Sequence, residues 1–286
     1  MKIQKTKLIL LFYLLLVTIA EILASYLNAQ VGLLAHFILL LIFVIHYTLI
    51  NMRKHTANTL QCRFIEGKRY PSRLMQLVID DYKQFSSILL TLTLIPMIRI
   101  LSLVMPLYNF APLYWFVLIG IAIYLSFIIL KIQQKIPLSD IGFKRPHLKH
   151  YPLEFAIILL AIPMGIAEFF ILQPEPLVTS FTVYNVVIVI IIFFVTVGLM
   201  EEIIFRGLLQ NNSIDILGPK KGILFTTLIF TALHIGNLSI LDCLLVFIVG
   251  GLYGITVYKT KSIIGVTISH TIVNIFLFII CPVFLA

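Results

Sequence analysis

The chain has 286 residues, of which 60% are hydrophobic and only 12% charged, and its mean hydropathy is +1.08. Soluble globular domains carry about a quarter charged residues, so this composition excludes them and predicts an integral membrane protein. The formal net charge of +9 is explained by basic loops beside anionic inner-leaflet lipid, and it gives no reason to expect a nucleic-acid partner.

Nine apolar windows, each close to the roughly 20 residues that cross ~30 Å of hydrocarbon, predict an all-α bundle of transmembrane helices. The seventh window is the shortest, so eight or nine spans are expected. The first is long and is followed by others, which favours a span over a cleaved signal peptide. The windows lie near residues 8–27, 31–50, 85–104, 113–130, 153–172, 183–200, 222–236, 240–258 and 263–285.

The basic residues predict the orientation of the bundle. Of the 21 Lys and Arg residues, all except Arg99 lie in the N-terminal segment or in alternate loops. Because cytoplasmic loops are enriched in these residues, the N-terminus is expected in the cytoplasm of a multi-pass cell-membrane protein. With nine spans, the C-terminus would lie outside.

The loop at 135–152 predicts two regions, a four-span membrane region (1–134) and a block with the remaining spans (135–286). The largest loop, about residues 51–84, contains the amphipathic stretch SRLMQLVIDDYKQF. This stretch predicts an interfacial helix lying on the inner leaflet. No loop is long enough to fold as a soluble domain.

Charged residues inside a bilayer are costly, so each is expected to pair or to serve function. Glu21 and Arg99 are both predicted about 20 Å from the inner face, at a rise of 1.5 Å per residue, which predicts an ion pair between them. Glu168 has a similar predicted depth and is an alternative partner for Arg99. His36 and His46 are expected to be packing or hydrogen-bonded residues.

Two adjacent carboxylates, Glu201 and Glu202, follow the apolar run VYNVVIVIIIFFVTVG at the predicted end of the sixth span. They point about 100° apart on a helix, so they are expected to have different roles. Glu202 precedes Arg206 by four residues, the favourable order for an ion pair, and Arg206 is expected to snorkel to the inner membrane edge. Glu201 has no local partner and could accept a proton from water.

Two further motifs, FTALH and HTIVN, lie on later spans. A spacing of four places Phe230 and His234 on one helix face, and His270 and Asn274 on one face of another helix. Taken singly, each polar residue could simply hold helices together. The predicted depths of His234 and His270 differ, roughly 18 and 11 Å, unless a cavity admits water from the cytosol.

Together, the motifs EEIIFR (201–206), FTALH (230–234) and HTIVN (270–274) resemble those of the CPBP, or Abi, intramembrane protease family. This family is named for C-a-a-X prenyl-protein endopeptidases and bacteriocin-processing proteins. Every matching position is kept, and the loop LSDIGFKRP resembles the family's usual lead-in. The resemblance covers about residues 135–280.

The resemblance implies a membrane-embedded endopeptidase with a cavity open to the cytosol. By this resemblance, Glu201 would activate the attacking water with help from His234. His270 and Asn274 would stabilise the oxyanion, and the Glu-Arg pair of the first motif would hold the helix end. The expected substrate is a peptide or lipidated protein cleaved near the cytosolic membrane face, in bacteriocin or peptide maturation or in self-immunity.

The family is described both as metal-dependent and as glutamate-based, and the sequence leaves the metal and the oligomeric state open. Glu201, His234 and His270 could ligate zinc with an open position, although the sequence has no HExxH helix of the zincin type. Ser269 adjoins His270, but helix neighbours diverge by ~100°, so these two are not expected to act as nucleophile and base.

Two other functions stay open at this point. A non-catalytic membrane partner that regulates a sensor kinase or a peptide exporter could retain every motif. A transporter would relay protons through Glu and His residues, but it should show internal repeats with broken helices in matching halves, and the sequence has no such symmetry.

Overall fold

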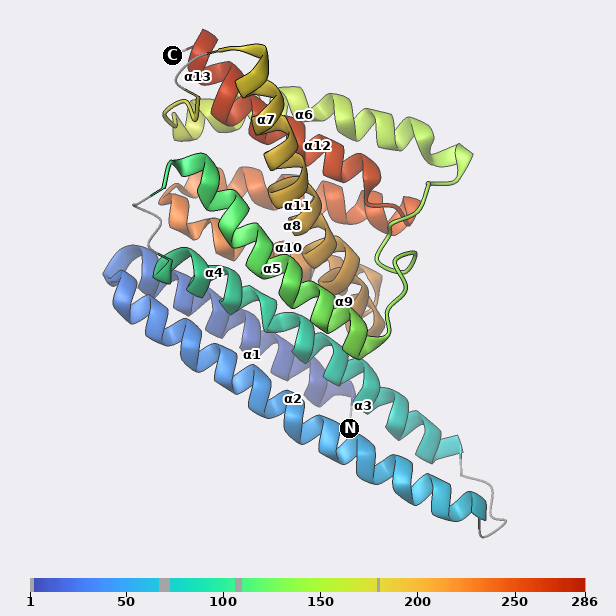
Figure 1. The fold of residues 1–286 in the computed structure, drawn as a ribbon. Coiled ribbons are helices and arrows are strands. Elements are labelled where there is room, and N and C mark those ends of the chain that lie inside the picture. Colours follow the sequence, from blue (N-terminus) through green and yellow to red (C-terminus); the bar gives the residue numbers. More distant parts are fainter. Residues whose placement is uncertain (1–2, 67–72, 106–109, 179–180, 286) are drawn as a thin grey trace.

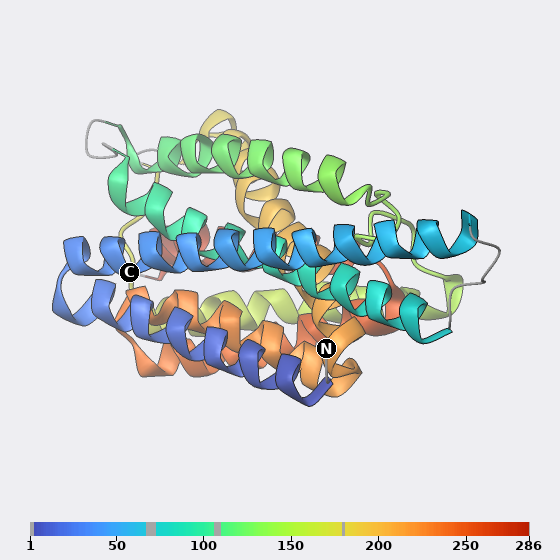
Figure 2. The same ribbon diagram turned by 90° about the horizontal axis from the view of Figure 1, so that it is seen from below.

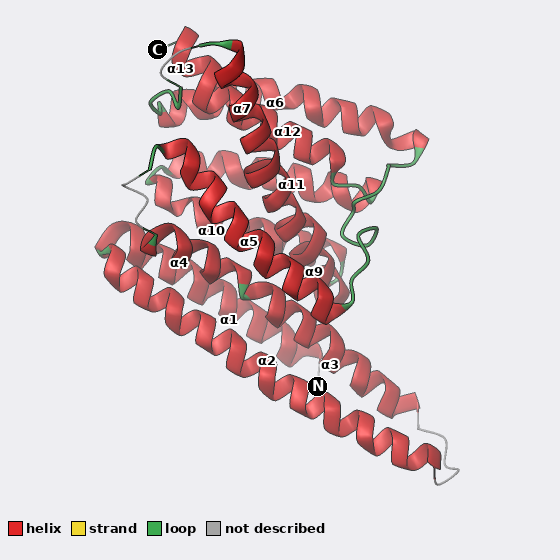
Figure 3. Cartoon of the chain, viewed as in Figure 1, coloured by secondary structure: helices red, strands yellow, loops and turns green. Residues whose placement is uncertain are grey.

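The computed structural model describes residues 3–66, 73–105, 110–178 and 181–285, and its regular elements in these ranges are all helices (Figures 1 and 3). Within the described residues, eight helices are long and apolar enough to cross a membrane. The predicted all-α membrane bundle is confirmed, at the lower of the two expected counts. These helices run Lys5–Leu27, Ala29–Thr59, Gln76–Val104, Pro112–Gln134, Leu148–Leu172, Val183–Leu217, Ile240–Thr260 and Ile264–Phe284.

Several of the long helices contain short π-helical segments, which divide them into shorter α-helical elements. The π-helical segments are Leu23–Leu27, Phe193–Leu199, Ile203–Leu209 and Phe276–Ile280. The α-helices are α1 (Ile3–Ile22), α2 (Ala29–Glu66), α3 (Arg73–Leu92), α4 (Leu94–Val104), α5 (Pro112–Gln134), α6 (Tyr151–Leu172), α7 (Val183–Ile192), α8 (Met200–Glu202), α9 (Gln210–Leu217), α10 (Pro219–Leu233), α11 (Ile240–Thr260), α12 (Ile264–Ile275) and α13 (Cys281–Phe284).

Helices α1 to α4 form one side of the bundle, where α2 and α3 lie side by side (Figures 1 and 2). The prediction of a separate interfacial helix is wrong, because the described part of that stretch lies in α3, which leads into α4 as one candidate span. Within the stretch, Ile79 and Phe85 are buried, and Ile88 and Leu89 are buried further along α3. Helix α3 packs these side chains against other helices of the bundle.

The seventh apolar window forms α10, which begins at Pro219 and ends at Leu233. A helix of 15 residues is only about 22 Å long, shorter than the hydrocarbon thickness. Proline suits the first turn of a helix because its missing N–H needs no partner there. Helix α10 packs between α9 and α11, and Phe225 and Ile229 are buried. It therefore belongs to the interior of the bundle.

The predicted sixth span is longer than expected, since the helix runs on from Val183 to Leu217. Glu201 and Glu202 thus lie in the middle of this helix, and the prediction that they lie at its end is wrong. The helix continues because every residue of Ile203–Leu209 is buried against neighbouring helices. The two glutamates lie between two π-helical segments, a geometry that is frequent at functional sites.

The predicted ion pair between Glu21 and Arg99 is formed, so Glu168 is not the partner of Arg99. Arg99 Nε donates to Glu21 Oε1 at 3.0 Å, and Nη2 lies 2.7 Å from Oε2. His36 Nε2 lies 3.4 Å from the same carboxylate, and His46 is hydrogen-bonded to Tyr13. Both histidines therefore take part in packing contacts, as predicted.

The largest apolar cluster combines residues from both predicted regions. Leu10, Phe43 and Phe85 come from the first region, and Phe205 and Ile229 come from the second. Burial of this apolar surface holds the two regions against each other. The division at residues 134 and 135 remains a prediction about organisation along the chain.

Candidate active site

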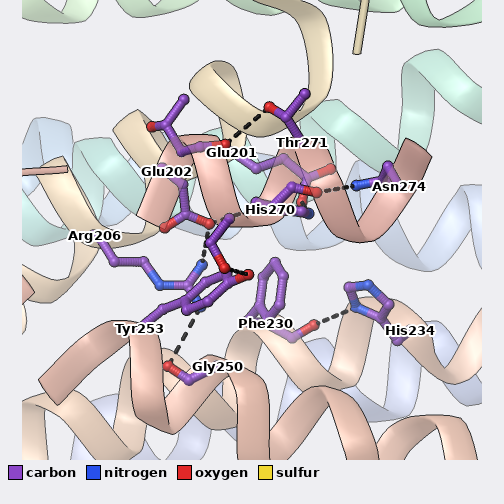
Figure 4. Close-up of polar contacts among 12 residues, drawn as sticks. Glu201, Glu202, Arg206, Phe230, His234, Gly250, Tyr253, His270, Thr271 and Asn274 are labelled. Carbon is purple, nitrogen blue, oxygen red and sulfur yellow. Dashed lines mark hydrogen bonds and ion pairs between the residues drawn. The ribbon is translucent and has the colours of Figure 1, made fainter. Parts of the chain in front are cut away.

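The predicted pair of Glu202 and Arg206 is formed and deeply buried (Figure 4). Arg206 Nη1 donates to Glu202 Oε1 at 3.1 Å, and the two side chains are 1% and 0% exposed. The guanidinium also lies 4.5 Å from the ring centre of Phe230 and 5.5 Å from that of Tyr253. Nη2 donates to the carbonyl of Gly250 at 3.4 Å. The prediction that Arg206 snorkels to the membrane edge is therefore wrong, because two aromatic faces bind the cation inside the protein.

His270 lies between the two adjacent carboxylates. Its Nδ1 is 2.9 Å from Glu202 Oε1, and its Nε2 is 3.9 Å from Glu201 Oε2. Because an ionised carboxylate only accepts, Nδ1 carries the hydrogen of this bond. The 3.9 Å gap is too long for a direct hydrogen bond, and it is a separation at which a bridging water should be considered.

The two glutamates have different environments, as predicted. The Glu201 side chain is 25% exposed, whereas that of Glu202 is 0% exposed. Glu202 uses one oxygen for both Arg206 and His270. Glu202 is thus a structural acceptor, and Glu201 remains open to a ligand.

His234 follows directly after α10, and its ring Nδ1 donates to the carbonyl of Phe230 at 3.0 Å. This bond fixes the ring and leaves Nε2 as the free nitrogen. The Phe230 ring centre lies 4.8 Å from that of His234 and 6.2 Å from that of His270. In Figure 4 the Phe230 ring stands between Tyr253 and His234.

One cavity of about 380 Å³ is lined by four of the predicted residues, Glu201, His234, His270 and Asn274. His234 and His270 therefore line the same cavity, although their predicted depths differ. A second cavity of about 340 Å³, lined by Arg99 among others, also reaches Glu201 and His234. Glu202 and Arg206 line neither cavity. Glu202 instead contacts the His270 ring, which lines the first cavity.

Asn274 lies one turn after His270, as the spacing predicts. Its Nδ2 donates to the carbonyl of His270 at 3.0 Å. A carboxamide nitrogen carries two hydrogens, so one donor of Asn274 is left for a ligand in the cavity. Its predicted place beside the imidazole is therefore supported by the geometry.

Glu168 of α6 also lines the cavity of about 380 Å³, and the motifs did not point to it. The sequence feature that points to Glu168 is its position inside a predicted span, where a charged carboxylate is costly. It was the alternative partner for Arg99, but it lies in the cavity with Glu201 and His270 instead. Only the packing of α6 against α12 places it there.

Two small residues allow close contacts between α12 and its neighbours. A Cβ atom at Gly198 would lie 2.4 Å from Thr271 Oγ1 and 3.0 Å from the carbonyl of Thr267, so glycine permits the close contact with α12. Ser269 is buried and donates to the carbonyl of Ile157 at 2.8 Å. Its hydroxyl is committed to packing, which agrees with the expectation that it is no nucleophile.

The predicted metal ligands do not form a metal site in this arrangement. Among the described residues, no group of three or more His, Cys, Asp or Glu side chains is placed to hold a metal ion. His234 and His270 each use Nδ1 on a protein acceptor. These bonds leave Nε2 of both rings free, as in metal-bound histidines, so it is the placement of Glu201, His234 and His270, and not their chemistry, that does not fit the zinc hypothesis among the described residues. No step below depends on a metal.

The fold and the site define a class: a multi-pass helical membrane protein with a carboxylate and two imidazoles around an internal cavity. Residues 183–276 match the family model described as Rce1-like, Type II CAAX prenyl endopeptidase Rce1-like. The match includes all three motifs and confirms the resemblance to CPBP proteases over about a third of the chain. No curated protein and no solved structure matches the chain. The matched family implies a protease that acts on a peptide or protein substrate at a membrane.

Proposed function

We propose that the protein is an intramembrane endopeptidase of the CAAX type in which Glu201 activates the attacking water. The observation that carries this proposal is the exposure of Glu201 into a cavity lined also by His234, His270 and Asn274. A general base must reach its water within hydrogen-bond distance. Glu201 meets this need, whereas the neighbouring Glu202 is fully buried.

The attacking water binds at Glu201 Oε2, the carboxylate oxygen that lies 3.9 Å from His270 Nε2. Glu201 removes one proton as the water oxygen attacks the scissile carbonyl, and it then gives this proton to the departing amine. His234 presents Nε2 to the same cavity and orients the water. The peptide bond breaks with no net change in protons on the protein.

The oxyanion formed in this step is stabilised by Asn274 and His270. Asn274 donates its second Nδ2 hydrogen, and His270 donates from Nε2 when it carries hydrogen on both nitrogens. Fixed donors at a developing oxyanion commonly contribute a hundredfold or more to the rate. Glu202 and Arg206 act behind these groups by fixing the His270 ring through the bond at 2.9 Å.

The proposed substrate is a peptide or a lipidated protein. A prenyl group is the proposed lipid, because the matched family is described as a CAAX prenyl endopeptidase. The apolar residues Phe116, Val249 and Leu277 line the cavity beside the polar groups and suit an apolar chain. The basic loops favour a cell-membrane protein with a cytoplasmic N-terminus and a cytosolic approach for the substrate. Peptide maturation or self-immunity is the physiological setting that the CPBP resemblance favours.

The test is turnover of a farnesylated C-a-a-X peptide by protein purified in detergent and assayed in H₂¹⁸O. We expect ¹⁸O in the new carboxylate of the product, and loss of turnover in Glu201→Gln. Asp80→Asn is the matched control, because Asp80 is an exposed carboxylate on α3, away from the cavity. Equal turnover in Glu201→Gln and the parent would overturn the role of Glu201.

The alternative function is a non-catalytic membrane partner that regulates a sensor kinase or a peptide exporter. The same experiment separates it from catalysis. If the parent protein binds the peptide without cleaving it and Glu201→Gln binds equally well, the peptidase proposal fails for this substrate. Survival of the cellular phenotype in Glu201→Gln would then favour the regulatory partner.

A further inference from the structure

Arg99 makes a third contact that its ion pair does not require. Besides the hydrogen bond from Nε to Glu21 and the ion pair of Nη2 with the same carboxylate, Nη2 donates to the backbone carbonyl of Leu233 at 2.6 Å. Leu233 is the last residue of α10, and His234 follows it directly. A charged group of the N-terminal region thus binds the backbone next to a residue of the candidate active site.

The end of α10 needs this contact for a physical reason. The last four carbonyls of an α-helix have no partner within the helix, and together they carry about half a negative charge. Helix α10 has no basic residue in its last turn. Thr231 and Ala232 accept from the backbone N–H of His234. The other two carbonyls accept from side chains: Phe230 from the His234 ring, and Leu233 from Arg99.

The guanidinium also packs against the turn that carries His234. A Cβ atom at Gly236 would lie 3.5 Å from both Nη1 and Nη2 of Arg99, so the backbone of this 3₁₀ turn rests on the guanidinium. Arg99 further lines the cavity that reaches Glu201 and His234. The cation therefore touches the chain on both sides of His234.

Glu21 fixes the direction in which Arg99 points. The Glu21 carboxylate is fully buried on α1 and binds two nitrogens of the guanidinium. This two-point contact leaves little freedom to the planar guanidinium. His36 of α2 lies 3.4 Å from Oε1, the oxygen that also accepts from Arg99 Nε.

We propose that Glu21 and Arg99 form a clamp, with His36 behind it, that positions His234 in the active site by holding the end of α10. The clamp joins α1, α2 and α4, which lie outside the matched residues 183–276, to the catalytic cavity. Arg99 is a positioning residue, because it acts through the backbone beside His234. The catalytic meaning of the clamp rests on the proposed peptidase function.

The test reads the His234 ring directly, by NMR of full-length protein with isotope-labelled histidine in detergent. Its ring signals are assigned by their loss in His234→Gln. The test variants are Arg99→Lys, which keeps the charge but loses the planar fork, and Glu21→Gln, which keeps the shape. Tyr13→Phe is the control, since it removes only a hydroxyl, which bonds to His46 between α1 and α2.

We expect shifted or broadened His234 signals in Arg99→Lys and Glu21→Gln, and unchanged signals in Tyr13→Phe. In turnover of the farnesylated peptide, kcat should fall about tenfold to a hundredfold, as for a small misplacement of a catalytic group, while KM stays within about twofold. Parental His234 signals in both test variants would overturn the clamp. Failure of the parent to cleave the peptide would count against the peptidase proposal alone, because the NMR result decides the clamp without a substrate.

Discussion

Among the described residues, two Glu–Arg pairs contain a fully buried glutamate, one in the N-terminal region and one in the motif-bearing region, and they are built differently. Glu21 and Arg99 are 78 residues apart and join α1 to α4. Glu202 and Arg206 are one turn apart on a single helix. The first pair connects helices and reaches the end of α10, whereas the second also binds the His270 ring. Similar ion pairs thus serve interhelical contact in one region and orientation of an imidazole in the other.

The comparison shows which carboxylates are free for chemistry. Glu21 and Glu202 are both fully buried beside an arginine. Glu201, the neighbour of Glu202, has no arginine partner among the described residues and is 25% exposed in the cavity. A buried, paired carboxylate therefore holds structure, and the exposed one is the candidate base.

The largest expected effect on stability comes from breaking the local pair. Arg206→Met removes the cation beside the buried Glu202 carboxylate and leaves it only the His270 hydrogen bond. Loss of one partner of a buried ion pair typically costs about 3–5 kcal/mol of unfolding free energy. Thermal and denaturant unfolding in detergent measure the loss. The double variant Glu202→Gln with Arg206→Met should recover part of it, because no unpaired charge remains. A parental stability for Arg206→Met would contradict the structural role of this pair.

Removal of the carboxamide should lower turnover without unfolding the protein. Asn274→Ala removes a donor from the cavity, and we expect kcat to fall by about a hundredfold to a thousandfold, as for other oxyanion donors. The control is Asn212→Ala, since Asn212 bonds to Thr91 outside this cavity. If Asn274→Ala keeps the parental kcat, Asn274 does not stabilise the oxyanion.

Separation of the two motif helices should have a smaller effect on stability. In Gly198→Ala the new methyl group would collide with Thr271 Oγ1, and such overpacking typically costs about 1–3 kcal/mol. Because this contact sets the distance between Glu201 and His270, turnover should fall as well. Gly251→Ala is the matched control, since nothing lies within 4 Å of a Cβ placed there. Equal behaviour of the two variants would show that Gly198 does not set the helix spacing.

Features that depend on local spacing could be predicted from the sequence. Apolar length predicted the spans, and the i, i+4 spacing predicted the contacts of Glu202 with Arg206 and of His270 with Asn274. The depth argument predicted the pair of Glu21 and Arg99. Each of these needs only the rise and the turn of a helix.

Features that depend on how helices pack could not be predicted in the same way. The bond between His270 and Glu202 joins residues 68 positions apart, and Glu168 reaches the cavity only through the packing of α6. The rings of Phe230 and Tyr253 cover Arg206, which is why it does not snorkel. These contacts depend on tertiary packing, which helix periodicity alone does not predict.

The central claim is that Glu201, and not the adjacent Glu202, activates water. The most direct measurement compares Glu201→Gln and Glu202→Gln with the parent, both in turnover of the farnesylated peptide and in thermal unfolding. We predict that Glu201→Gln unfolds like the parent but loses roughly a thousandfold in turnover, within the usual range for a general base, whereas Glu202→Gln unfolds at a lower temperature. A stable Glu201→Gln protein that cleaves the peptide at the parental rate would contradict the claim.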